Sequence, residues 1–325
     1  MPIIEIKDDE HWHELRRNRI GASDIAGLFN CGNSWTPTVN ELYHMMRGNL
    51  PRNRSAGVLA ALGKAMEPFI AFAISDIHGW RLEPCKRYHI HPEHDHLGCT
   101  LDYDVVESEH GPGILQIKNV QQFAPGWSQN RAPDHVELQH QQEFLVTNEA
   151  RIAKGLKPFA WGAIGAMFAG NPEDIRVMLR SPDPKVHKHI IERSSKFMQD
   201  VRDMKEPPLL GSEDYAHVAE LFKATEVVEE EVKDLRGDAI MDDWVAQFHK
   251  AKAEIKHHEQ VADEMKARII HRLLTEKADG MVKAISGRTD LYTIGVKQIE
   301  VNYKAKPAST GVQLRFKAEA IDTSV

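Results

Sequence analysis

The hydrophobic positions of the chain predict a long helix over residues 58–78. Its apolar side chains recur at three- and four-residue spacing, the period of one helix face. Glu67 lies within this helix beside Pro68, and an isolated glutamate on a helix usually faces solvent. Shorter helices are expected over residues 11–19 and 38–47. The apolar stripe of the long helix consists of Leu59, Leu62, Met66, Ile70, Ala73 and Ile77.

Beyond residue 80 the pattern changes to short strands that alternate with helices. Two further helices are expected, one that begins at Pro133 and one over residues 185–204, where the Pro207-Pro208 pair follows its end. Helices, then a mixed sheet, then helices indicate one α/β domain over residues 1–210. The expected strands are 80–91, 97–106, 114–120, 159–168 and 174–180.

The composition shifts after residue 210, so residues 211–325 are expected to form a separate extension. An acidic run occupies residues 226–234, and apolar residues then recur at helical spacing over 240–273. This pattern predicts one long amphipathic helix, or two helices in a hairpin. Its apolar stripe is interpreted as a surface for assembly or for a partner. Short strands are expected after it, at 291–296, 298–303 and 312–316.

A Gly/Pro turn at residues 109–113 joins two of the predicted strands into a hairpin. Residues two apart on a strand point to the same face, so Gln116 and Lys118 project together. If the strands pair antiparallel, Asp102 lies near this polar pair. A carboxylate, a second oxygen ligand and a lysine can hold Mg²⁺ and orient an attacking water. An ordinary hairpin with a solvated face is the alternative that these residues alone favour.

Composition narrows the class of protein. The chain has 325 residues with 42% hydrophobic content, enough for a buried core, and no apolar run approaches the roughly 20 residues that span a bilayer. Three cysteines without a C-x-x-C pair, and an N-terminal stretch without a signal-peptide pattern, suit a reducing cytoplasm. The net charge of −7 argues against an indiscriminate nucleic-acid coat, although a locally basic site remains compatible with it.

Two further clusters suggest ligands. Ser23 lies at the expected start of a short helix, close to the arginine cluster that includes Arg16, and a helix start with guanidinium groups nearby suits a phosphate. A plain N-cap with solvated arginines explains the same residues. The segment HIHPEHDH at 89–96 carries four histidines, but their spacing matches no structural zinc pattern, which favours a surface turn.

Five segments, taken in chain order, resemble the YqaJ-like, lambda-exonuclease-type viral recombinases, a branch of the PD-(D/E)XK nuclease superfamily. The resemblance spans roughly residues 12–208. The segments are Arg16 with IGASD at 20–24, GKAMEP at 63–68, TLD at 100–102, ILQIKN at 114–119 and HVELQHQ at 135–141. No single segment is decisive, but their order and spacing are specific.

The resemblance implies a restriction-endonuclease-like core, a mixed central sheet flanked by helices, that carries a Mg²⁺-dependent exonuclease. Mn²⁺ is the expected substitute metal. Ligands to the metal would be Asp102, Gln116, the Ile117 backbone carbonyl and Glu67. Lys118 would position and help deprotonate the attacking water, and Gln139 would line the site. Arg16 and Ser23 would bind the 5′-phosphate of a DNA end.

The resemblance also implies partners and a setting. The enzyme would degrade the 5′ strand of linear double-stranded DNA and leave 3′ overhangs for phage-type recombination by a single-strand annealing protein. A ring-shaped homotrimer around the DNA is implied, without membrane contact. The implied location is the cytoplasm of a bacterial host, with the gene carried by a phage or prophage.

One position departs from the family pattern, because Gln116 stands where the family has glutamate. Its amide still offers an oxygen to Mg²⁺ but brings no charge. A tolerated natural variant, an inactivating change and an engineered substitution all remain open. An alternative function is therefore a catalytically weakened DNA-end-binding protein of the same fold. A sequence-specific endonuclease would share the core, but the Arg16 and Ser23 motif suits a DNA end rather than an internal site.

Overall fold

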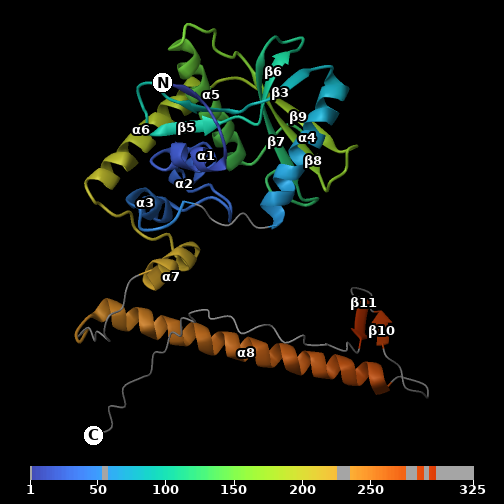
Figure 1. Ribbon diagram of the computed structural model, residues 1–325. Coiled ribbons are helices and arrows are strands. Elements are labelled where there is room, and N and C mark those ends of the chain that lie inside the picture. Colours follow the sequence, from blue (N-terminus) through green and yellow to red (C-terminus); the bar gives the residue numbers. More distant parts are fainter. Residues whose placement is uncertain (1, 53–57, 225–234, 276–283, 289–292, 298–325) are drawn as a thin grey trace. The chain divides into compact units, whose positions relative to one another are not determined.

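The structure is a computed structural model that describes residues 2–52, 58–224, 235–275, 284–288 and 293–297. The chain divides into two compact units, Met1–Thr225 and Glu226–Val325. The first unit contains two mixed sheets flanked by helices (Figure 1). The α/β class and the mixed sheet predicted from the sequence are therefore confirmed.

The larger sheet has five strands in the order β3-β6-β7-β8-β9. Only β7 and β8 run parallel; the other neighbours are antiparallel. A parallel pair needs a crossover connection, and helix α5 (Asp134–Ile152) lies on that connection. The strands are β3 (Arg81–Pro84), β6 (Tyr103–Glu107), β7 (Gly113–Val120), β8 (Gly162–Phe168) and β9 (Ile175–Arg180).

A second sheet has the order β1-β4-β5-β2, built from β1 (Ile3–Glu5), β4 (Arg87–Ile90), β5 (Leu97–Thr100) and β2 (Ile20–Gly21). The long strands predicted over 80–91 and 97–106 are each divided between the two sheets. At the division the Cys85 N–H donates to the Asp102 carbonyl at 3.1 Å, so the strand pair stays joined as it passes from one sheet to the other. Asp102 therefore lies at a bend in the backbone rather than inside a strand.

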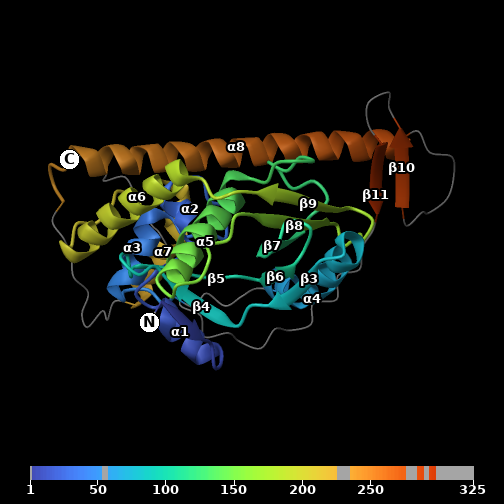
Figure 2. The ribbon, with the colours of Figure 1, turned by 90° about the horizontal axis from the view of Figure 1, so that it is seen from above.

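Two long helices cover opposite faces of the larger sheet (Figure 1). Ile70 and Ile74 of α4 pack against Leu115, while Phe144 of α5 packs against Ile114 on the other face. Helices α5 and α6 run side by side (Figure 2). The helices of the first unit are α1 (Asp9–Arg16), α2 (Ile25–Leu28), α3 (Val39–Arg47), α4 (Val58–His78), α5, α6 (Pro184–Arg202), the 3₁₀ turn η1 (Ser212–Asp214) and α7 (Tyr215–Ala224).

Helix α5 approaches the sheet closely because Gly162 has no side chain. A Cβ atom there would lie 2.6 Å from Ile114 Cγ1 and 2.8 Å from Phe144 Cζ. Those distances are shorter than carbon atoms tolerate, so any larger residue would push the helix away. The close approach brings the polar side chains of α5 next to β7.

Burial on the two long helices follows their neighbours in the fold. Only part of the apolar stripe of α4 is buried: Ile70 packs in the core together with Ala71 and Ile74, whereas Leu62 and Ile77 are 49% and 60% exposed. On α5 the polar Gln142 is fully buried and donates to the carbonyls of Ile20 (2.9 Å) and Gly98 (3.2 Å). A helix wedged between two sheets has little solvated surface, so polar residues on it bind the sheet edges instead.

The first unit extends past the expected boundary at residue 210. Asp214 of η1 accepts from Thr38 Oγ1 at 2.5 Å, and His217 of α7 lies 2.8 Å from Asn40 Oδ1. Thr38 also caps α3 by accepting from the Glu41 N–H. These contacts fasten η1 and α7 to α3, and the division falls after residue 225.

The second unit contains one uninterrupted helix, α8 (Ala239–Thr275), followed by the antiparallel strands β10 (Ala284–Arg288) and β11 (Thr293–Lys297). The long-helix prediction is thus confirmed over the hairpin alternative. Strand β11 corresponds to the strand expected at 291–296, whereas β10 was not expected. Ile240, Trp244 and Ile255 of the predicted stripe are exposed within this unit. The acidic run and the strands predicted beyond residue 298 lie outside the described residues. No helix in the described part of the chain is long and apolar enough to cross a membrane.

Candidate active site

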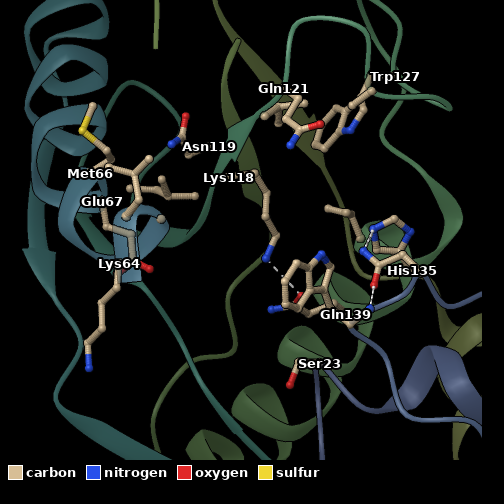
Figure 3. Close-up of a pocket in the computed structure, with 18 of the residues that line it drawn as sticks. Ser23, Lys64, Met66, Glu67, Lys118, Asn119, Gln121, Trp127, His135 and Gln139 are labelled. Carbon is tan, nitrogen blue, oxygen red and sulfur yellow. Dashed lines mark hydrogen bonds between the residues drawn. The ribbon is translucent and has the colours of Figure 1, made fainter. Parts of the chain in front are cut away.

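A cavity of about 830 Å³ opens in the first unit where α4, β7 and α5 meet. Lys118 extends between Glu67 on the α4 side and Gln139 on the α5 side (Figure 3). Elements far apart in the sequence thus converge at one place. Five residues that the sequence singled out line this cavity: Ser23, Glu67, Ile117, Lys118 and Gln139.

Asp102 takes the place of a strand neighbour at the edge of β7. Strand β6 begins at Tyr103, which pairs with Leu115 of β7. The next backbone N–H of β7 that points toward β6 belongs to Ile117, and β6 has no residue to pair with it. Asp102 Oδ2 accepts from this donor, the Ile117 N–H, at 2.7 Å. In an extended strand the carbonyl of a residue points to the same edge as its N–H. The Ile117 carbonyl therefore faces the side on which Asp102 lies.

Gln116 and Lys118 project from the same face of β7, as the sequence predicted, and both meet α5. Lys118 Nζ donates to Gln139 Oε1 at 3.1 Å. Gln116 is buried, and its Nε2 lies 3.5 Å from Glu143 Oε1. The neighbouring residues Leu115 and Ile117 pack in the apolar cluster with α4. The alternation of the strand thus separates polar contacts from core contacts.

Both acidic residues of the site hold their protons more tightly than usual. Burial raises the pKa of Glu67 to about 7, with a smaller contribution from the negative charge of Asp102, against the opposing effects of Lys118 and Lys64. Burial also raises the pKa of Asp102 to about 6, although Lys118 and the Ile117 N–H favour its ionised form. Such shifts are frequent where carboxyl groups are held close together for chemistry or metal binding.

The residues fit a divalent cation with oxygen ligands. Gln116 Oε1 is buried and has no hydrogen-bond partner among the residues that the structure describes. The Asp102 carboxylate and the Ile117 carbonyl face the same edge of β7. Carboxylate, amide and carbonyl oxygens are the ligands that Mg²⁺ prefers. A buried acceptor left unpaired is costly, and a cation would satisfy it.

The expected phosphate-binding pair is brought together, although not by a helix start. Arg16 Nη2 lies 3.4 Å from Ser23 Oγ, and Ser23 lines the cavity whereas Arg16 does not. Helix α2 has only four residues and begins after Asp24, whose side chain makes no capping bond. Asp24 instead pairs with Arg16 at 3.4 Å and with Arg52 at 2.9 Å. Two guanidinium groups around one carboxylate leave a net positive cluster.

Sequence reasoning missed three residues of this neighbourhood. Asp24 and Arg52 become neighbours only through the fold. Glu143 lies one turn after Gln139 on α5, a spacing that is visible in the sequence, but its burial depends on the packing of α5 against the sheet.

The histidine-rich turn lies at the surface, where Glu93 and Asp95 are exposed. Two of its histidines, His89 and His91, are buried. The described residues nevertheless contain no group of three or more His, Cys, Asp or Glu side chains arranged to hold a metal ion. His91 Nδ1 accepts from the backbone N–H groups of Glu93 and His94, which gives it a structural part in the turn.

Residues 11–150 match the YqaJ-like viral recombinase domain. This range contains every residue that the sequence singled out for the site, from Arg16 to Gln139. The predicted resemblance to these recombinases is therefore confirmed over this part of the chain. The match, together with the convergence of Glu67, Asp102 and Lys118, supports a nuclease function. No curated protein matches the chain.

Solved structures of an alkaline exonuclease are similar to this chain at low identity. LHK-Exo in complex with dAMP is 17% identical with a TM-score of 0.46. The alkaline exonuclease LHK-Exo from Laribacter hongkongensis is 15% identical with a TM-score of 0.41. Each alignment covers 61% of this chain and 94% of the other.

Proposed function

We propose that the chain is a Mg²⁺-dependent exonuclease that degrades the 5′-terminated strand of linear double-stranded DNA and leaves 3′ overhangs. The observation that carries this proposal is the arrangement of three charged side chains at the edge of β7. There Asp102 accepts from the Ile117 N–H, the Lys118 ammonium lies beside it, and Glu67 faces both from α4. The domain match over residues 11–150 supports DNA as the substrate class.

The oxygens of Asp102, Gln116, Glu67 and the Ile117 carbonyl would hold the Mg²⁺, or Mn²⁺ in its place. When bound, the metal supplies positive charge that stabilises the phosphate as its P–O bond is displaced. The residues around it account for the remaining chemistry.

Lys118 and Glu67 divide the handling of the attacking water. The Lys118 ammonium is held by Gln139 Oε1, and its remaining N–H groups are free to donate to the water oxygen and orient it. Glu67 approaches the same place from α4 and would help to hold the metal and the attacking water in position.

Arg16 and Ser23 would bind the 5′-phosphate at the rim of the cavity. Asp24 holds the Arg16 guanidinium next to Ser23, so the side chain is oriented before DNA arrives. A charge-assisted contact with a phosphate would then fix the end of the strand to be degraded.

The product and the likeness to recombinases extend the proposal to partners. A 3′ single-stranded overhang is the substrate of a single-strand annealing protein, which would act next. A homotrimer that encloses the DNA would let an acidic chain retain its substrate between cleavage steps.

A catalytically weakened DNA-end-binding protein is the second candidate, because Gln116 brings no charge to the metal site. Linear and covalently closed circular duplexes, incubated with protein and Mg²⁺, separate the candidates. The exonuclease proposal predicts degradation of the linear duplex alone, and none with a chelator. End binding without degradation would favour the second candidate, and cleavage of the circle would contradict both.

A further inference from the structure

Glu143 of α5 is the shared hydrogen-bond partner of several polar side chains beside the site. Its side chain is 3% exposed. Oε1 lies 3.0 Å from Gln139 Nε2 and 3.5 Å from Gln116 Nε2, and Oε2 lies 3.2 Å from His140 Nδ1. A single carboxylate thus meets the amide groups of Gln139, which lines the cavity, and of Gln116, which is buried on β7 beside it.

These contacts fix which way each amide points. An amide whose NH₂ group donates to a carboxylate turns its carbonyl oxygen to the opposite side. Gln139 shows the consequence, since its Oε1 accepts from the Lys118 ammonium at 3.1 Å. Gln116 is held in the same manner, and its Oε1 is the buried acceptor left without a partner in the described structure. Gln139 Oε1 therefore already contacts the Lys118 ammonium, and Gln116 Oε1 is oriented to accept a metal cation.

The Glu143 carboxylate also places a negative charge near the position where Gln116 lacks one. The family pattern has glutamate at this position of the strand. Here the amide of Gln116 stands between the proposed metal and the carboxylate of Glu143. A hydrogen bond from the amide to a carboxylate polarises it and makes its carbonyl oxygen a better ligand, as partners behind metal ligands commonly do.

We propose that Glu143 is a positioning residue that orients Gln116 and Gln139 and strengthens Gln116 Oε1 as a ligand for the metal. This inference rests on the proposed function. In this inference, the Gln116 amide and the Glu143 carboxylate that is hydrogen-bonded to it together replace the single glutamate ligand of the family pattern. Glu143 acts through the two amides because both of its own oxygens are already taken.

The test exchanges the two side chains in the full-length protein. Binding of Mn²⁺ without DNA is measured by isothermal titration calorimetry for the parent, Glu143→Gln, and the double variant Gln116→Glu with Glu143→Gln. Loss of the carboxylate should weaken Mn²⁺ binding roughly 10- to 100-fold, the usual cost of removing a partner behind a metal ligand. The double variant should recover most of the loss, because it returns the carboxylate to the strand.

The matched control is the same glutamate-to-glutamine substitution at another position of α5. Glu137 is also on α5, but it pairs with Arg180 at 2.6 Å and does not line the cavity. Glu137→Gln should leave Mn²⁺ affinity unchanged. Thermal unfolding of the metal-free proteins shows whether each variant is folded.

Three results would overturn the inference. The first is a folded Glu143→Gln variant that binds Mn²⁺ as the parent does. The second is a double variant that recovers nothing. The third applies if Glu143→Gln does not fold. The double variant then decides, and a double variant that does not bind Mn²⁺ with about parental affinity overturns the inference. A parent that degrades DNA with Mg²⁺ while Glu143→Gln binds normally refutes the inference alone. A parent without metal-dependent cleavage refutes the proposed function as well.

Discussion

Asp102 Oδ2 accepts the Ile117 backbone N–H at 2.7 Å, at the point where β7 has lost its neighbour β6. This one bond fastens a carboxylate to the part of β7 that β6 no longer covers, next to the Lys118 side chain. It lets one acidic residue serve both the strand and the proposed metal site. One oxygen completes the hydrogen bonding of the strand, and the other is available to a ligand.

Asp102→Asn should separate these two roles. Asparagine keeps an oxygen that can accept from Ile117 but has no charge for a metal, so DNA degradation should fall at least about a hundredfold. Stability should change in the opposite direction at pH 8. The pKa of Asp102 is raised from 3.8 to about 6 in the folded protein, so the parent loses stability as the pH rises from 3.8 to about 6, and at pH 8 the asparagine variant should melt higher.

Two assays on the same preparation check this prediction: the rate of DNA degradation and thermal unfolding at pH 5 and pH 8. The gain in melting temperature should shrink at pH 5, where Asp102 of the parent is largely protonated. A variant that keeps parental activity would remove Asp102 from the metal site.

Metal binding should release protons in a limited range of pH. The pKa values of Asp102 and Glu67 lie near 6 and 7, and a metal displaces the protons that these groups still carry. At pH 6.5, the heat of Mn²⁺ binding should therefore depend on the ionisation heat of the buffer. At pH 8.5 the dependence should vanish. A binding heat that is independent of the buffer at both pH values would show that these carboxyl groups do not ligate the metal.

Arg16→Ala should remove the preference for a phosphorylated 5′ end. A charge-assisted contact of this kind contributes on the order of 1.5–3 kcal/mol, or roughly ten- to a hundredfold in rate. Its neighbour Arg17 is exposed and supplies the matched control, since Arg17→Ala should leave the preference intact. Initial rates on duplexes with 5′-phosphate and 5′-hydroxyl ends measure both. An equal loss of preference in the two variants would indicate general attraction to DNA.

A fragment of residues 1–225 should fold, whereas residues 1–210 should be less stable. The shorter fragment lacks Asp214 and His217, which bind Thr38 and Asn40 next to the start of α3. Each lost hydrogen bond costs about 1 kcal/mol, roughly 2–4 °C in melting temperature for a protein of this size. Thermal unfolding of the two fragments compares them directly. An insoluble 1–225 fragment would mean that the first unit depends on the second.

Local patterns predicted the long helices, because periodicity and turn residues act within a few positions. The bounds of α4 agree with the prediction, and Gln116 and Lys118 share a face as their spacing requires. The passage of one strand pair through two sheets was not predictable, since it depends on pairing between distant segments. The bend at Asp102 and the burial of Gln142 and Glu143 follow from that passage, because it encloses α5 between the sheets.

The central claim is most directly tested by following each strand of a linear duplex separately. One end of the duplex carries a 5′-phosphate, the other is blocked, and the two strands carry different internal labels. With Mg²⁺, the account predicts that the strand beginning at the 5′-phosphate is shortened while its complement stays full length and becomes single-stranded. Loss of the complementary strand from its 3′ end, or an intact duplex at every Mg²⁺ concentration, would contradict it.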